Sequence, residues 1–367
     1  MNKLLQLICI LSLSLYSVDS SAQIFKINIT DYDGADADPI LKALIDTEII
    51  KVQDEVNQDL PSASPDRLMQ GMANSSVMAG KGIGTDYASK MNVVLIGAGV
   101  GVGADLTKDK TTQGDISGVG VAPGLIIGAN LGFLDAERIL GMDTDRLNMY
   151  VNYAGYNYNH VLNDKPDKKS SIDAKMNAMG THFRYDWIKG NDSKLFGWGG
   201  VKFHFGYEYN KTEITFKSKI NQAVNTTSGG ATITGTITGS PVATITSATH
   251  SIPLALSTDF QLLYFLSFYT GLGADINFGQ AKGKGSVNAN ESTVSCSAGA
   301  TCTGAGNPDI KVQPTANING KGSVTPFTFR ALAGLQFNLP WTRIFVQADK
   351  GLGNNLIAAT AGLRFAF

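Results

Sequence analysis

The stretch that decides the fold is NLIAATAGLRFAF, which covers Asn355 to Phe367. Every odd-numbered position from Ile357 to Phe367 is apolar, whereas the even-numbered positions include the polar residues Thr360 and Arg364. Side chains of a β-strand point alternately to its two faces, so this pattern provides one face suited to lipid. The segment therefore predicts a strand that lies in a membrane.

A lipid-facing strand that closes on a Phe resembles the assembly signal of bacterial outer-membrane β-barrels. Leu363, Phe365 and Phe367 carry this resemblance. It implies an all-β, antiparallel, up-and-down transmembrane barrel in the bacterial outer membrane. Outer-membrane lipid and the barrel-assembly machinery are the implied partners, and no particular activity is implied.

The composition fits an exported barrel. The chain has 367 residues, 17% of them charged, and its formal net charge of −1 suggests neither nucleic acid nor an acidic ligand as a partner. Many of the 41 glycines lie inside apolar runs, which are poor places for glycine in a helical protein. No apolar run reaches the roughly 18–20 residues of a membrane-spanning helix. The length suffices for one large barrel and a small accessory segment.

Residues 1–22 are interpreted as a secretory signal peptide. An apolar run from Leu4 to Leu15 follows Lys3, and small residues occupy Ser20 to Ala22. We expect cleavage after Ala22, and because no Cys follows that site we expect no lipoprotein anchor.

Residues 23–86 are predicted to form an N-terminal helical segment. Asp38-Pro39 resembles a helix start, and apolar residues then recur at spacings of three and four, so Asp38–Leu60 is expected to be an amphipathic helix. Ser64-Pro65-Asp66 starts a second, shorter helix, which Gly80–Gly84 ends. The segment is expected either to plug the barrel or to lie in the periplasm. If the first helix is the plug, its charged side chains would meet Arg and Lys residues of the lumen. These charged helix residues are Asp46, Glu48, Lys51, Asp54 and Glu55.

From Met91 onwards the period of the apolar residues changes to two, and residues 87–367 are assigned to the barrel. Alternation is clearest in Phe196–Lys217, where it continues over about ten residues, the length that a tilted membrane strand needs. Ten strands are predicted, with eight and twelve as alternatives. They are Met91–Ala104, Gly118–Leu131, Arg146–Val161, Ser171–Ile188, Phe196–Lys217, Ile252–Leu266, Phe268–Gln280, Thr325–Leu339, Thr342–Asp349 and Asn355–Phe367.

The connections between these strands alternate in length, as outer-membrane barrels require. The longest, Gln222–Ser247 and Ala281–Gly322, are expected to be extracellular loops, and short ones such as Pro340–Trp341 periplasmic turns. Within the first loop, Gly239-Ser240-Pro241 suggests the turn of a hairpin. These two loops are where an extracellular ligand would bind, although they would equally serve only to screen the surface.

Cys296 and Cys302 lie close together in an exported chain, so they are expected to form a disulfide that closes a small loop. No His is nearby, which makes a metal site much less favoured.

Polar side chains that alternate with the apolar ones are assigned to the lumen, where opposite charges are expected to pair into a network that fills a narrow barrel. Glycines such as Gly97, Gly101 and Gly103 share that face and leave room inside. The predicted network consists of His182, Arg184, Asp186, Lys202, His204, Glu208, Asp259, Asp275, Arg330 and Arg364, joined by Asp349.

Little in the sequence supports a catalytic or cofactor-binding site. GAGVGVGAD at residues 97–105 loosely matches a dinucleotide-binding loop, but no helical pattern follows it. Some ten-stranded outer-membrane barrels are proteases with clustered Asp and His at the extracellular edge, and a twelve-stranded class are phospholipases that use Ser and His. Here His160 lies near Asp164 and Asp167 without the paired aspartates of the first class. We therefore predict no catalytic, cofactor or metal residues and expect no enzyme.

Three functions remain from the sequence, of which the first is preferred. The arrangement of barrel and loops resembles surface adhesins of spirochaete-like diderm bacteria, which implies a binding or structural protein that displays loops. The alternative is a narrow or gated channel with the N-terminal helices as its plug, and a hydrolase at the rim is a second alternative.

Overall fold

The computed structural model describes residues 27–33, 65–88, 93–106, 117–134, 136–165, 168–191, 195–228, 231–289, 292–297 and 310–367. The expected signal peptide, the expected helix Asp38–Leu60 and Cys302 lie outside these residues. Cleavage after Ala22, the first helix and the disulfide therefore stay predictions.

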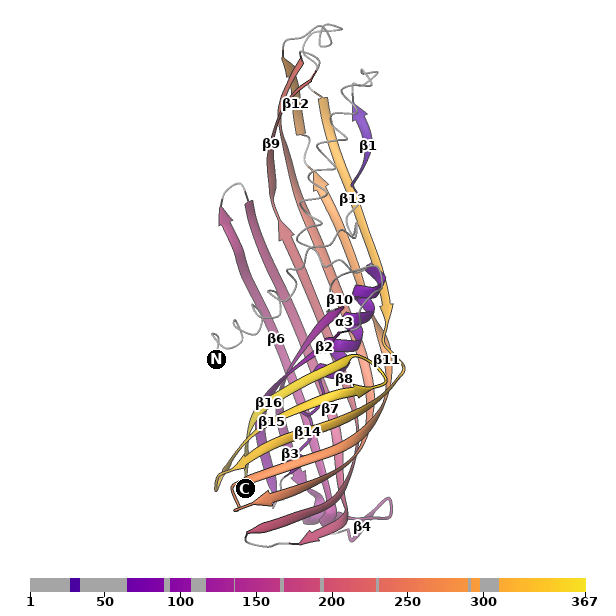
Figure 1. Cartoon of the computed structure of the whole chain (residues 1–367), viewed down its shortest axis with the longest axis vertical. Helices are drawn as coiled ribbons and strands as arrows, with labels where there is room; N and C mark the ends of the chain where they lie inside the picture. Colours follow the sequence, from indigo (N-terminus) through magenta and orange to yellow (C-terminus); the bar gives the residue numbers. More distant parts are fainter. Residues whose placement is uncertain are drawn as a thin grey trace.

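Ten strands in the described ranges pair with their neighbours in an antiparallel ring (Figure 1). The last strand closes the ring on the first, from Leu356 opposite Asp105 to Ala366 opposite Leu95. The predicted barrel and its ten strands are confirmed. The strands are β2 (Val94–Asp105), β3 (Gly118–Asn130), β6 (Leu147–Lys165), β7 (Lys168–Asn191), β8 (Phe196–Ser218), β10 (Ala231–Leu262), β11 (Leu266–Ala289), β14 (Phe327–Asn338), β15 (Thr342–Leu352) and β16 (Leu356–Ala366).

Burial alternates along the strands as a membrane barrel requires. In β2 the odd-numbered residues from Leu95 to Asp105 face the lumen, whereas Ile96 is 49% exposed on the outer face. Leu125 and Ile127 of β3 are likewise more than 60% exposed. A continuous outer face of large apolar side chains would be unfavourable in water, so this face is the one that contacts lipid.

One end of the barrel carries short turns. Leu263–Phe265 joins β10 to β11, and the backbone N–H of Val93 donates to the last carbonyl, that of Phe367, at 3.1 Å. Short periplasmic turns and long extracellular connections are the rule in these barrels, so this end is periplasmic. The β3–β6 connection lies there too, with the 3-10 turns Leu131–Phe133 and Thr144–Arg146 around β4 (Arg138–Ile139) and β5 (Met142–Asp143).

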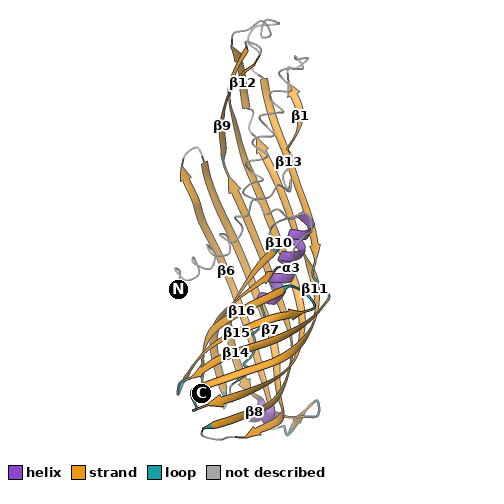
Figure 2. Cartoon of the chain, in the orientation of Figure 1, coloured by secondary structure: helices purple, strands orange, loops and turns teal. Residues whose placement is uncertain are grey.

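At the other end the sheet is very uneven in height (Figure 2). β10 alone has 32 residues, about 105 Å at about 3.3 Å per residue, whereas a membrane strand needs about 9–11 residues. β9 (Ile220–Ser228), β12 (Ser292–Ser297), β13 (Ile310–Ser323) and β1 (Ile27–Asp33) pair into this part of the sheet. We call the strands beyond the membrane the outer sheet: β1, β9, β12, β13 and the outer parts of β6, β7, β8, β10 and β11.

The expectation of two long loops was therefore wrong over most of their length. Gln222–Ser247 lies largely in β9 and β10, and much of Ala281–Gly322 lies in β11, β12 and β13. The expected hairpin exists, but Gly239-Ser240-Pro241 is not its turn, since these residues pair with Ala289, Asn288 and Val287 of β11. β9 and β10 instead flank Gly229-Gly230, a dipeptide suited to a tight hairpin turn.

One α-helix, α3 (Pro65–Ala79), lies among the described residues. No helix in this part of the chain is long and apolar enough to cross a membrane.

We expect the purified protein to migrate differently on a gel with and without boiling. All ten neighbour pairings of the ring are made, and a barrel closed by backbone hydrogen bonds stays folded in detergent until heated. Identical mobility before and after boiling, together with solubility in the absence of detergent, would contradict a closed barrel.

Candidate functional site

The helix α3 lies inside the barrel, and the chain continues from it through the lumen to Ala88. Every residue from Gly71 to Ala88 is buried. The helix begins at Pro65, as the Ser64-Pro65-Asp66 pattern predicts, because proline lacks the N–H that the first helical turn would leave unpaired. We call residues 65–88 the plug.

Glycines of β2 and β3 let the backbone of α3 come close to the barrel wall. A Cβ at Gly103 would lie 2.7 Å from the backbone nitrogen of Ala79 and would overlap the carbonyl of Ser75. On the neighbouring strand, a Cβ at Gly120 would lie 2.5 Å from the same carbonyl group. Gly101 and Gly103 thus make room for a helix, and the stretch 97–105 is a barrel strand, not a nucleotide-binding loop.

Apolar side chains fix the outer half of the plug. Met69, Met72 and Val77 pack in one cluster with Ala281 of β11 and with Val324, between β13 and β14. The remaining members of this cluster are Leu68 and Ala73, with Ile214 and Ile245 against it. Asn74 adds two polar contacts, since its amide donates to Asp105 at 3.0 Å and its oxygen accepts from the backbone N–H of Thr325 at 2.8 Å.

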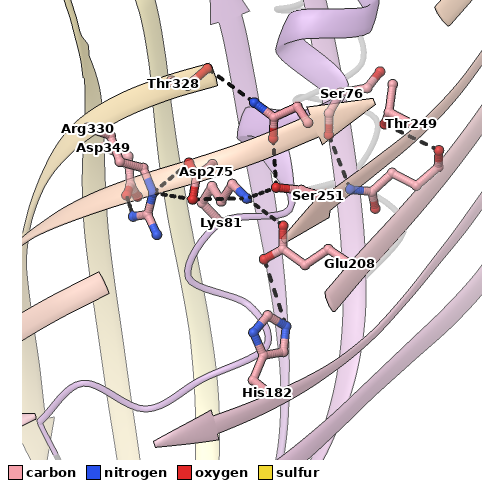
Figure 3. A network of polar contacts seen from close by, with 12 residues as sticks. Ser76, Lys81, His182, Glu208, Thr249, Ser251, Asp275, Thr328, Arg330 and Asp349 are labelled. Atoms are coloured by element: carbon pink, nitrogen blue, oxygen red, sulfur yellow. Dashed lines mark hydrogen bonds and ion pairs between the residues drawn. The ribbon is translucent and has the colours of Figure 1, made fainter. Parts of the chain in front are cut away.

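Lys81 lies at the middle of the lumen in a buried ion network (Figure 3). Its Nζ lies 2.7 Å from Glu208, 3.6 Å from Asp275 and 2.7 Å from the Ser251 hydroxyl, so three different strands contact one plug side chain. Arg330 continues the network, with its Nε 3.0 Å from Asp275 and its guanidinium paired with Asp349. A buried ammonium is tolerated where it is paired and hydrogen-bonded in this way.

Basic residues of the wall also hold backbone carbonyls of the plug. Arg364 donates to the carbonyls of Thr85 at 2.6 Å and Gly82 at 3.3 Å, and its guanidinium lies 3.4 Å from the Asp86 carboxylate. Arg184 donates to the carbonyl of Asp86 at 2.8 Å. These carbonyls belong to a non-helical segment, so the arginines supply hydrogen bonds that regular secondary structure would otherwise provide.

Near the periplasmic end, Tyr87 anchors the plug by its ring and its backbone. The ring stacks on Tyr269 of β11 with centroids 5.6 Å apart, and the Tyr87 carbonyl accepts from Lys202 at 3.1 Å. Lys202 is also paired with Asp259. Beyond this point a cavity of about 240 Å³ opens at the periplasmic mouth, with Ala88, Trp198 and Arg343 in its lining.

The two lumen histidines serve the packing of the plug. His204 Nε2 lies 2.7 Å from the Ser257 hydroxyl and its Nδ1 lies 3.3 Å from the Thr85 hydroxyl, so both ring nitrogens have hydroxyl partners. His182 Nε2 is 3.8 Å from Glu208. The cavity beside these rings measures about 10 Å³, which is room for about one water molecule. A substrate therefore has no space at this Ser–His pair.

Nine of the ten residues of the expected network are buried in the lumen, and so is Asp349. Asp186 is only half-buried, because a bulge between Asp186 and Ile188 interrupts the register near the periplasmic rim. The partners were predicted less well: Arg184, Lys202 and Arg364 contact residues 81–87, whereas the charged residues expected to meet them, at 46–55, lie outside the described part. The assignment of residues 87–367 to the barrel also starts too early, since Tyr87 and Ala88 belong to the plug.

The sequence places His160 near two aspartates at the outer end of a strand, which are residue types of a rim hydrolase. His160 lies on the outer part of β6, where its ring stacks on Tyr158 at 5.9 Å, and no side-chain placement is described for Asp164 or Asp167. Among the described residues, no group of three His, Cys, Asp or Glu side chains is arranged to hold a metal ion. Lys81, Asn74, Asp86 and Tyr87 were not predicted from the sequence, although a charged residue between two glycines at 80–82 is a signal that could have identified Lys81.

Gly103→Ala is expected to destabilise the barrel by about 1–3 kcal/mol, the usual cost of overpacking a well-filled interior. The added methyl group meets backbone atoms of Ser75 and Ala79, which cannot rotate away. The temperature at which the folded gel band disappears should fall. Ala104→Val, which adds bulk on the outward face of the same strand, should leave that temperature nearly unchanged; equal effects would contradict the packing described.

Comparison with known proteins gives one family and several distant structures. A family model described as Lsa36-like matches residues 21–367. No curated protein matches the sequence. Among solved structures, the transport unit of the autotransporter AIDA-I from Escherichia coli shares 10% identity at a TM-score of 0.34, over 80% of this chain and 96% of that one. The attachment invasion locus protein Ail of Yersinia pestis shares 12% identity at a TM-score of 0.20, over 75% and 100%.

Proposed function

The chain belongs to the Lsa36-like family, and from the plugged barrel we propose that it is a surface-exposed binding or structural protein of the bacterial outer membrane. The observation that carries this proposal is the combination of a filled lumen with an outer sheet far longer than a membrane requires. The barrel then serves as an anchor, and the outer sheet is the part that meets a partner.

A filled lumen argues against open transport. The plug is buried from Gly71 to Ala88, and contacts of Lys81, Arg364 and Tyr87 join it to at least three barrel strands. A gated channel would have to break several of these buried contacts in each opening. The anchor function is tested with the full chain in planar bilayers, where we expect no steady channels. Steady channels from the unmodified protein would favour transport.

The outer sheet presents basic side chains that suit an anionic partner. On β11 and β13 the exposed lysines Lys282 and Lys321 are directly opposite each other in the register, and Lys284 follows two residues along. Lys211 and Lys217 of β8 are exposed on the same outer part, with Asp173 beside Lys217 at 2.6 Å as a compensating acid. Clustered charge of one sign attracts ligands of the opposite sign, and salt weakens that attraction.

Dextran sulfate is the probe that tests this surface, with neutral dextran for comparison. The purified barrel should bind dextran sulfate, and the triple variant K282Q/K284Q/K321Q should bind it several-fold more weakly, with a smaller dependence on salt. Lys189→Gln, at the periplasmic end of β7, is the matched control and should bind as the unmodified protein does. Equal binding by the triple variant would contradict an anionic partner at these lysines.

A further inference from the structure

The plug has a direction through the barrel. Its first residues contact the outer rim: Asp66 accepts from the backbone N–H of Lys321 in β13 at 2.8 Å. Arg67 lies 3.4 Å from Asp105, the residue at the outer end of β2. The plug therefore begins on the extracellular side.

Its last residues contact the periplasmic half of the barrel. Asp86 lies 3.6 Å from Arg343, the second residue of β15, and Tyr87 stacks on Tyr269, near the periplasmic start of β11. β2 then begins at Val94 beside Phe367 and returns outwards. The plug therefore runs inwards and β2 runs back outwards, so Pro65 lies at the cell-surface side.

An independent pairing agrees with this direction. β1 runs from Ile27 to Asp33 and pairs antiparallel with β13, from Ile27 opposite Ala316 to Asp33 opposite Lys311. Residues 311–316 belong to the outer sheet, beyond the Lys321 level at which the plug enters. A segment near the start of the chain therefore lies on the extracellular side as well.

We infer that the barrel carries its own N-terminal segment to the cell surface. Residues 65–88 then remain in the lumen and connect that segment to the barrel. This function, the export and display of residues that precede the barrel, goes beyond the proposed anchoring of an outer sheet. In this inference the lumen is the route by which the chain itself crossed the membrane, and it is not a channel for solutes.

Passage through the lumen follows from the chemistry of the segment. Residues 23–64 contain nine acidic and three basic residues, and charged groups cannot cross the hydrocarbon layer without a large desolvation cost. Each of the ten strands pairs with both of its neighbours, and the β16–β2 pairing closes the wall into a ring around the plug. The segment either passes through the lumen or the barrel closes around it, and both routes leave it outside.

The test is the side of the membrane on which the segment is found. An epitope tag inserted between Gly34 and Ala35 should be labelled by antibody on intact cells as strongly as after permeabilisation. The same tag between Gly229 and Gly230, in the outer hairpin, is the extracellular control. A tag between Leu140 and Gly141, in the exposed periplasmic β4–β5 turn, should be labelled only after permeabilisation.

Labelling of the 34–35 tag only after permeabilisation would overturn the inference, provided that the outer control is labelled on intact cells. The gel shift on boiling reports that each tagged barrel is folded. If an insertion prevents folding, a single cysteine, D36C in a C296S/C302S background, gives the same readout with a membrane-impermeant maleimide. Dextran sulfate binding through the outer lysines does not depend on the result, so the two proposals fail separately.

Discussion

Deleting residues 65–88 should give a barrel with steady ion channels, whereas the full chain is expected to show none. The plug fills the lumen so closely that the cavity beside His182 and His204 holds about one water molecule. Without it, the glycines at Gly101, Gly103 and Gly120 would face open space, and the charged wall residues would be hydrated. A pore lined by charges is favourable for ions, and the expected measurement is single-channel conductance in planar bilayers.

The control for this deletion removes material from the outer sheet instead. Shortening the β9–β10 hairpin by residues 221–238 should change the display of the sheet and leave the lumen closed, because these residues pair only with outer strands. Both variants should retain the gel shift on boiling, which reports a folded barrel. A deletion of the plug that is folded and as tight as the full chain would show that the plug is not the seal.

Replacing Lys81 by Met should cost about 3–5 kcal/mol, since it leaves buried carboxylates without their counter-charge. Glu208 and Asp275 both pair with the Lys81 ammonium, and the Lys81 side chain has no exposed surface. Arg330 remains beside Asp275, so Glu208 is the group most affected. The temperature or urea concentration at which the folded gel band is lost should drop markedly.

Two further variants separate charge from packing at this position. Lys81→Arg keeps the positive charge and should recover part of the lost stability. Lys350→Met changes an exposed lysine on β15 and should behave as the unmodified protein does. If Lys81→Met were as stable as the control, the network around Lys81 would contribute nothing to holding the plug.

The transmembrane part of the fold could be predicted because lipid imposes a strict rule on the sequence. Each membrane strand must alternate apolar outward residues with lumen residues, and segments such as Phe196–Lys217 show this directly. The outer sheet is under no such rule. Gln222–Ser247 is rich in Thr, Ser and Gly at both odd and even positions, a composition typical of a loop. Nearly all of this segment nevertheless lies in β9 and β10.

The lumen network was predictable as a set of residues but not as a set of contacts. Alternation places Glu208, Asp275 and Arg330 on one face, and that much follows from the period of two. Their partner Lys81 is 127 residues away from Glu208 in the chain, and no local pattern relates two such positions. The helix expected at 38–60 was considered for the plug because it has an apolar face and charged residues, whereas the helix found in the lumen is α3, which is buried through Met69, Met72 and Val77 together with small residues.

The closing of the ring has a consequence for the order in which the molecule can be assembled. β16 pairs with β2 across more than 250 residues of chain, and Arg364 near its end donates to the carbonyls of Gly82 and Thr85. Contacts this distant in sequence form slowly and only once both partners are present. Until β16 is in place, β2 and β15 have unpaired edges, and the plug lacks the hydrogen bonds that Arg364 donates. Completion of synthesis and export is thus a physical precondition for both the seal and the wall.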